Sequence, residues 1–227
     1  MILIKLLFFI LVTVSTNLFF VLSSSIYAQQ QQTNANIEKI IIQNEGTISK
    51  PTIHVNIQGT EIVDKIKGGD GNDIISGENG GDTLNGGLGD DKIFGNNGND
   101  KINGKLGDDE IDGGDNNDNI KGEEGDDDIY GRKGDDKLDG GRGNDKVDGG
   151  DGNDKIKGGD GNDELTGGRG NDEIEGGEGK DKLKGGEGAD TFICNGDDKI
   201  SDFDSAEGDK KRGSCSVIDK SSNAESS

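Results

Sequence analysis

Aspartates recur along the chain at a spacing that could build a row of metal-binding carboxylates. From residue 73 to residue 190, an aspartate occupies every ninth position without interruption. The 14 members of this set are Asp73, Asp82, Asp91, Asp100, Asp109, Asp118, Asp127, Asp136, Asp145, Asp154, Asp163, Asp172, Asp181 and Asp190. Calcium prefers about six to eight oxygen ligands in a flexible arrangement, and carboxylates supply such oxygens. The spacing therefore predicts a series of divalent-cation sites.

Each of these aspartates is the sixth residue of a nine-residue repeat that begins at Gly68 and ends at Ile193. Position one is Gly in all 14 repeats, position four is Gly in 13, and position eight is always apolar. Residues 59–67 keep Gly, Asp and an apolar residue in register, so a degenerate repeat precedes the array. A short fixed period predicts a solenoid in which each repeat contacts its neighbours.

These residues resemble the RTX family of calcium-binding nonapeptide repeats, whose known pattern is G-G-x-G-x-D-x-U-x. The resemblance covers residues 59–193. It implies an all-β fold, a right-handed parallel β-roll in which two repeats form one coil of 18 residues. It also implies that the position-six aspartates bind Ca²⁺ between repeat n and repeat n+2, so that 14 repeats could hold up to about 12 ions.

The repeat pattern predicts a turn at positions one to six and a short strand at positions seven to nine. Alternation along the strand sends only the position-eight side chain inward. Burying one such residue contributes about 1.5–3 kcal/mol, whereas ordering the backbone costs about 1–2 kcal/mol per residue. Bound cations are therefore expected to supply part of the free energy of folding.

Six residues depart from the glycine pattern of the turns. Position two is not Gly at Glu78, Asn96, Lys105, Glu123 and Arg132, and position four is Asn at Asn116. Sites that use these turns, mostly in the first half of the array, are expected to bind more weakly. Residues 140–193 keep the pattern and are expected to bind best.

The composition would by itself suggest disorder, because only 27% of residues are hydrophobic and the net charge is −22. The strict phase of the repeat argues against disorder. An acidic chain is a poor partner for nucleic acid or an anionic membrane and a good partner for cations. Loss of residues 1–28 would leave a charge of −23, which about 12 calcium ions would nearly neutralise.

Residues 1–28 have the features of a secretory signal peptide. Lys5 is their one charged residue, residues 6–22 are mostly apolar, and Ala28 is a small residue suited to cleavage. The alternative is an uncleaved membrane anchor, which the polar residues between 13 and 17 disfavour. The protein is therefore predicted to be secreted or extracellular, and to contact a membrane only if this segment is uncleaved.

Short segments are expected to cap the array at both ends. Residues 29–58 are predicted to form a spacer and two cap strands, Ile37–Ile42 and Thr52–Ile57, with His54 as an inert surface residue. Residues 194–227 are predicted to form a cap and a polar tail, since an open solenoid end exposes strand edges. The residues expected to cover the last coil are Ile193, Ile200, Phe203, Val217 and Ile218.

Two cysteines, Cys194 and Cys215, flank the predicted C-terminal cap. An even count in an exported chain favours a disulfide, which would stabilise the cap by about 3 kcal/mol. Two free thiols or a metal-binding pair are the alternatives, although no C-x-x-C spacing supports a metal.

No catalytic function is predicted for this chain. About 30 residues separate the signal peptide from the array, and the sequence has no zinc-type H-E-x-x-H motif, phosphate loop or Ser/His/Asp set. The first hypothesis is a secreted calcium-binding β-roll with a structural, cell-surface or matrix role. The alternatives are an adhesion or recognition module that docks through positions seven and nine, and an accessory subunit of a separately encoded extracellular enzyme.

Overall fold

The computed structural model describes residues 54–217, and these residues form 19 β-strands and no helix. Accordingly, this described region contains no helix long and apolar enough to cross a bilayer. The odd-numbered strands are β1 (Asn56–Thr60), β3 (Ile74–Asn79), β5 (Lys92–Asn97), β7 (Glu110–Asp115), β9 (Asp128–Lys133), β11 (Lys146–Asp151), β13 (Glu164–Arg169), β15 (Lys182–Glu187), β17 (Lys199–Ile200) and β19 (Ser216–Val217). The even-numbered strands are β2 (Lys65–Asp70), β4 (Thr83–Leu88), β6 (Lys101–Leu106), β8 (Asn119–Glu124), β10 (Lys137–Arg142), β12 (Lys155–Gly161), β14 (Glu173–Gly179), β16 (Thr191–Cys194) and β18 (Lys210–Gly213).

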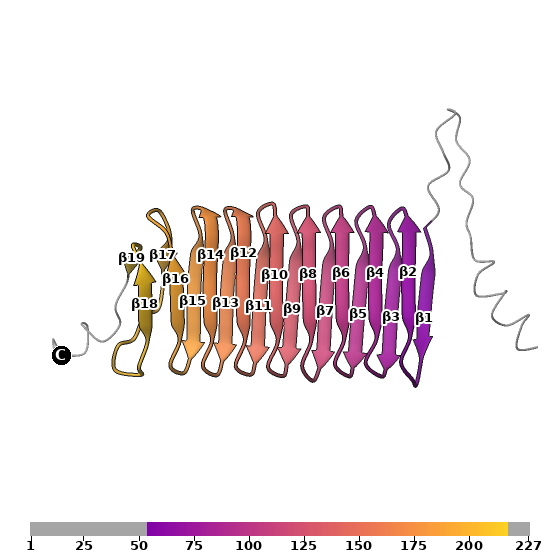
Figure 1. The fold of residues 1–227 in the computed structure, drawn as a ribbon, viewed down its shortest axis with the longest axis horizontal. Coiled ribbons are helices and arrows are strands. Elements are labelled where there is room, and N and C mark those ends of the chain that lie inside the picture. Colours follow the sequence, from indigo (N-terminus) through magenta and orange to yellow (C-terminus); the bar gives the residue numbers. More distant parts are fainter. Residues whose placement is uncertain (1–53, 218–227) are drawn as a thin grey trace, which may run out of the picture. The chain divides into compact units, whose positions relative to one another are not determined.

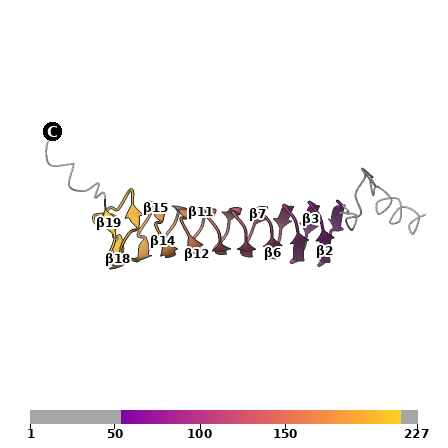
Figure 2. The same cartoon turned by 90° about the horizontal axis from the view of Figure 1, so that it is seen from above.

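The strands form two parallel sheets that face each other across a thin core. The odd strands make a 10-stranded sheet and the even strands a 9-stranded sheet, each in sequence order. Figure 1 shows the strands of the two sheets running in opposite directions, and Figure 2 shows the two layers from above. The register joins residues 18 apart, as in Ile75 with Ile93 and Leu84 with Ile102. The fold is therefore a parallel β-solenoid of about nine coils, which confirms the predicted β-roll class.

The strands are longer than the sequence pattern suggested. Most cover six residues, from position seven of one repeat to position three of the next, and the turn is confined to positions four to six. The expected division into a six-residue turn and a three-residue strand is therefore wrong. Pairing with the next coil explains the difference, because Gly141 and Arg142 continue the ladder against Gly159 and Asp160. These contacts between coils keep the glycine-containing segment in the ladder, although Gly141 and Gly159 have positive φ values of 118° and 122°.

The position-eight residues form the core, as predicted. They run from Ile75 to Phe192 with at most 2% of each side chain exposed. One apolar residue per repeat thus fills the space between the sheets, and the neighbouring residues at positions seven and nine point outward in the alternating burial pattern of the strands.

The stacking continues beyond residue 193. Strand β17 pairs with β15 and β19 pairs with β17, so the C-terminal segment adds rungs to the odd sheet. Ile200 is fully buried, and Phe203 and Val217 pack against the core as expected. A disulfide joins Cys194 to Cys215, with 5.8 Å between their Cα atoms. The segment closes the coil end that would otherwise expose apolar rungs.

At the other end, strand β1 takes only Asn56 and Ile57 from the predicted strand Thr52–Ile57 and runs on to Thr60. Ile57 packs against the core as the first rung. The predicted signal peptide, the spacer, strand Ile37–Ile42, residue Ile218 and the polar tail lie outside the described residues.

Candidate metal centre

The turns place the 14 position-six aspartates in two columns, one along each side of the roll. Residues 18 apart in sequence are neighbours within a column, so Asp136 lies next to Asp154. Each of the 14 side chains is buried, with 1–3% exposed. The predicted ligands are therefore brought together in the arrangement of repeat n beside repeat n+2.

One oxygen of each carboxylate is fixed by the backbone. The Asp136 amide donates a hydrogen bond of 2.8 Å to Asp154 Oδ1, and the same bond recurs along both columns. All 14 aspartates accept in this way from the residue 18 positions earlier, at 2.7–2.9 Å. This bond sets the orientation of the carboxylate without using its second oxygen.

The second oxygen, Oδ2, is buried and has no hydrogen-bond partner in 13 of the 14 aspartates. Buried polar atoms are nearly always partnered, so a repeated orphan of this kind needs an explanation. The glycine at position one lies beside this oxygen. A Cβ atom placed on Gly131 would lie 2.5 Å from Asp136 Oδ2 and 2.5 Å from the Gly149 carbonyl oxygen. A Cβ placed on Gly77 would similarly lie 2.5 Å from Asp82 Oδ2 and 2.9 Å from the Gly95 oxygen.

Position one is therefore glycine because oxygens crowd the space where a side chain would begin. None of the position-one glycines of the array has a positive φ, so backbone conformation does not explain the requirement. A carboxylate oxygen of one repeat and a carbonyl oxygen of repeat n+2 flank this space in 12 of the 14 repeats. Such a set of hard oxygen donors fits Ca²⁺, and the position-six carboxylates with the position-one carbonyls are the groups that would hold it.

Burial perturbs the same carboxylates. Desolvation, reinforced by neighbouring aspartates of the column, raises the pKa of Asp118 to about 8 and that of Asp154 to about 7. Burial raises the pKa of all the other position-six carboxyls as well. Without a cation these groups favour protonation, and a bound divalent ion supplies the missing positive charge.

The composition of the site points away from transition metals. Within residues 54–217, no group of three or more His, Cys, Asp and Glu side chains gathers around one point. Both cysteines are in the disulfide. Backbone carbonyls would have to complete the coordination shell, which suits calcium better than zinc.

A second ladder at position five was not recognised from the sequence. The Asn153 amide donates to Asp135 Oδ1 at 2.8 Å, and the Asn171 amide donates to Asn153 Oδ1 at 3.0 Å. Asn or Asp occupies position five in 11 of the 14 repeats, which was the available signal. His54 begins one of these ladders, because the Asn72 amide donates to its Nδ1 at 2.8 Å. The histidine expected to be inert therefore has a structural contact.

Three further aspartates extend the site beyond the array. Asp198 Oδ1 accepts from the Asp181 amide at 3.2 Å, and Asp209 Oδ1 accepts from the Asp190 amide at 2.9 Å. Asp202 accepts from the amides of the last position-one and position-two glycines, at 2.9 and 3.0 Å. The D-x-I spacing at Asp198 was the sequence signal for the first of these.

The six departures from the glycine pattern are strained. Within residues 54–217 they are the six non-glycine residues with positive φ, from 73° at Asn96 to 93° at Lys105. The other four are Glu78, Asn116, Glu123 and Arg132. The left-handed region costs about 1–2 kcal/mol for such residues, with Asn the best tolerated. Their turns nevertheless keep the hydrogen bonds of the position-six columns.

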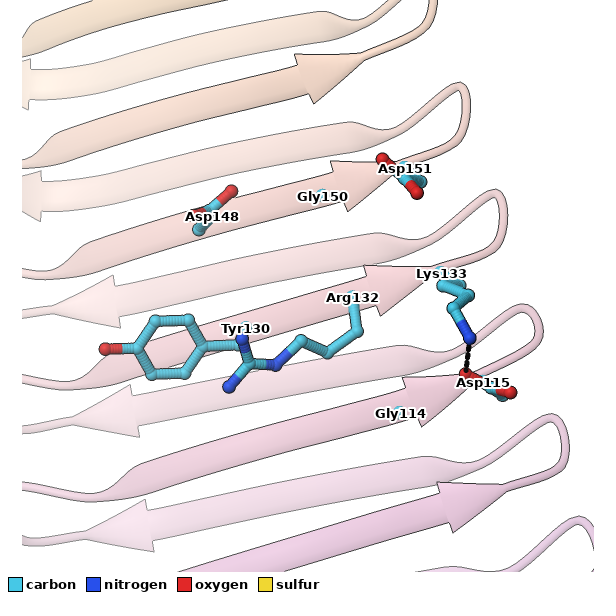
Figure 3. Close-up of a pocket in the computed structure, with 8 residues that line it drawn as sticks. All are labelled: Gly114, Asp115, Tyr130, Arg132, Lys133, Asp148, Gly150 and Asp151. Carbon is cyan, nitrogen blue, oxygen red and sulfur yellow. Dashed lines mark hydrogen bonds and ion pairs between the residues drawn. The ribbon is translucent and has the colours of Figure 1, made fainter.

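A shallow pocket lies on the outer face of the 10-stranded sheet, over β7, β9 and β11 (Figure 3). The Arg132 guanidinium lies 4.7 Å from the centre of the Tyr130 ring and makes an ion pair of 2.7 Å with Asp112. Lys133 pairs with Asp115 at 2.9 Å. The pocket exists because both neighbours of Arg132 in the register are glycines. Its basic groups are already paired, and its lining holds no nucleophile beside a base.

Comparison with protein families agrees with this geometry. A model described as the RTX calcium-binding nonapeptide repeat (4 copies) matches seven overlapping segments. These are residues 58–93, 76–111, 94–129, 112–147, 121–156, 143–174 and 157–192, which together cover more than half of the chain. A search of curated proteins gave no match.

Proposed function

The chain belongs to the family of RTX calcium-binding nonapeptide-repeat proteins, and we propose that it is a secreted protein whose β-roll folds on extracellular calcium. The observation that carries this proposal is the repeated, buried and unpartnered Oδ2 atom of the position-six aspartates. A single orphaned oxygen could be a local defect. Thirteen in phase support a ligand that recurs with the same period.

Calcium would couple binding to folding because the roll has little else to stabilise it. One buried apolar residue per repeat does not offset the cost of ordering nine residues. The buried carboxylates make the metal-free roll less stable still, since burial raises the pKa of each of them. A ligand that binds only the folded chain stabilises it by mass action.

The number of ions follows from the stacking. Twelve repeats have a position-one carbonyl from repeat n+2 beside their own position-six carboxylate, which supports up to about 12 sites. Loss of residues 1–28 would leave a charge of −23, which ions of this number would nearly neutralise. Repulsion between stacked acidic turns would then be removed.

We assign the protein a structural, cell-surface or matrix role rather than a catalytic one. The disulfide between Cys194 and Cys215 fits an oxidising, extracellular compartment. The basic groups of the pocket of Figure 3 are held in ion pairs, which supports this assignment. A calcium-dependent recognition module is the second candidate, favoured by the unequal charge of the two outer faces described below.

A calcium titration of the mature chain tests the proposal. Circular dichroism should show little β-structure in chelator and a cooperative gain at millimolar calcium, with magnesium a poor substitute because it requires a tight octahedron. Native mass spectrometry should count up to about 12 ions. A β-rich fold that persists in chelator would contradict the proposal.

Export is tested separately by mass spectrometry of culture medium. The secreted product should begin at or near Gln29. Recovery of the chain with Met1 intact in the membrane fraction would instead support an anchored protein.

A further inference from the structure

The outer face of the 9-stranded sheet carries an excess of lysine that the net charge of the chain conceals. Between β2 and β12, positions seven and nine of the even strands hold seven lysines and one aspartate. The seven residues, called here the lysine face, are Lys65, Lys67, Lys101, Lys121, Lys137, Lys155 and Lys157. All seven side chains are exposed.

The opposite sheet has the reverse balance. At the same positions between β3 and β13 it holds two lysines and five acidic residues. Three lysines at position seven of that sheet are paired with acidic residues of adjacent strands. Lys92 pairs with Glu110, Lys146 lies 3.3 Å from an oxygen of Asp128, and Lys182 of β15 makes a similar pair.

The lysine face has one such pair. Lys121 lies 3.4 Å from an oxygen of Asp139, and the other six lysines make no ion pair with any described residue. Lys155 is the direct register neighbour of Lys137 on the β10 side, at the strand spacing of about 4.8 Å, and of Glu173 on the β14 side. Like charges in this position destabilise a sheet. An anionic partner would remove the penalty.

The residues between the lysines indicate the kind of partner. Thr83, Asn85 and Asn119 stand in the same two rows, with side chains that can bond hydroxyl groups. None of the side chains at positions seven and nine of the even strands from β2 to β12 is aromatic or apolar. Single-stranded nucleic acid needs aromatic stacking platforms, and a membrane surface needs inserted apolar side chains. The exposed apolar residues of this sheet, Leu88 and Leu106, lie apart from these rows at the strand ends.

We propose that the lysine face binds a linear polysaccharide that carries sulfate or carboxylate groups. Lys65, Lys101 and Lys137 recur at every second coil, about 10 Å apart. A chain laid across the strands meets a cation at regular intervals and amide or hydroxyl groups between them. The inference rests on the proposed function, because the rows exist only when calcium has stacked the coils.

Titration of the calcium-loaded full chain with three dextrans tests the proposal. Dextran sulfate and carboxymethyl dextran should bind, in a salt-dependent manner, and unmodified dextran should not. The triple variant Lys101→Gln, Lys137→Gln, Lys155→Gln should bind at least about tenfold more weakly. The matched control Lys92→Gln, Lys146→Gln, Lys182→Gln removes the same charge from position seven of the other sheet and should change affinity by less than about twofold.

Equal losses of affinity for the anionic dextrans in the two triple variants would overturn the assignment of binding to the lysine face. So would tighter binding of a single-stranded oligonucleotide or of phosphatidylglycerol vesicles than of the two anionic dextrans. Acetylation footprinting of the unmutated protein gives a second measurement that needs no variant. Dextran sulfate should protect Lys101, Lys137 and Lys155 and leave Lys92 and Lys146 reactive; uniform protection would contradict the proposal. Circular dichroism in calcium, recorded on each sample, separates a failure to bind from a failure to fold.

Discussion

Replacement of Asp154 with asparagine should stabilise the metal-free roll and destabilise the calcium-bound roll. Asparagine keeps an oxygen that can accept from the Asp136 amide, which donates to Oδ1 at 2.8 Å. The change replaces the unpartnered Oδ2 by an amide group that can donate a hydrogen bond. It also removes the charge that a cation would need.

The size of the effect follows from the pKa of Asp154, which burial raises from its ordinary 3.8 to about 7 in the metal-free roll. The pKa of this carboxyl is higher in the folded chain than in the unfolded chain. Burying it therefore costs least below about pH 4, where it is protonated in both states, and the metal-free fold loses stability as the pH rises through 7. At pH 8 the difference corresponds to at most about 4 kcal/mol, reduced by solvent screening, and asparagine would relieve it. In calcium, loss of the charged ligand should raise the calcium midpoint at least about tenfold.

Two titrations at pH 8, both followed by circular dichroism, measure the two effects. In chelator, trimethylamine N-oxide should fold the Asp154→Asn variant at a lower concentration than the unmutated chain, because the osmolyte favours burial. In calcium, the same variant should need more of the ion to reach half of its β signal.

Asp148→Asn is the matched control. Asp148 stands at position nine of a neighbouring repeat, on the exposed outer face. Its replacement should leave the calcium midpoint within about twofold, since it is no part of the position-six columns. The reasoning fails if Asp154→Asn moves both titrations in the same direction, or if the two variants behave alike.

Four further outcomes are expected. In chelator, acidification from pH 8 to pH 4 should increase β structure, since burial raises the pKa of the position-six carboxyls to about 6–8 in most repeats. In calcium, the same acidification should weaken calcium binding, because protons compete with the ion for the carboxylate ligands. A circular dichroism signal that falls with acid in chelator would refute the first part. Gly131→Ala should destabilise the calcium-bound roll by about 1–3 kcal/mol in guanidinium unfolding, whereas Gly196→Ala, where a Cβ meets nothing within 4 Å, should be neutral. Asn116→Gly should lower the calcium midpoint slightly, by relieving a residue at φ 83°, and an unchanged midpoint would remove strain as the cause of weaker turns. Non-reducing peptide mapping of secreted protein should recover Cys194 linked to Cys215, and free thiols there would count against the bridge.

The repeat made the core and the carboxylate columns predictable. A period of nine with an apolar eighth residue determines which side chains face inward once two repeats form a coil. Ile75 and Ile93 therefore meet in the register as expected, and so do the aspartates two residues before them. These features depend only on the position of each residue within the nine-residue repeat, which can be read directly from a repetitive sequence.

The length of the strands was not predictable by the same reasoning. Glycine at positions one and two reads locally as a turn. Parallel pairing with the residue 18 positions away keeps Gly141 in the ladder against Gly159, and this contact is non-local. A cap past residue 193 was predicted, but the continuation of the carboxylate columns into it was not, because Asp198 follows Asp181 by 17 residues and Asp209 follows Asp190 by 19. A search at a fixed period does not detect rungs that are shifted by one residue.

The two side-chain ladders act in opposite directions, and this explains why calcium binding should be cooperative along a column. A position-six carboxylate reaches back to the amide of the preceding coil, as Asp154 does to Asp136. A position-five side chain reaches forward, as Asn153 does to Asn171. An ion that fixes one carboxylate therefore fixes the turn before it, and the position-five contact fixes the turn after it. The 11 position-five Asn and Asp residues leave gaps only in the second repeat and in the last two, so the coupling runs unbroken through the middle of the array. Order should thus spread between residues 18 apart in sequence, and a defect in one column should affect its own turns more than those on the other side of the roll.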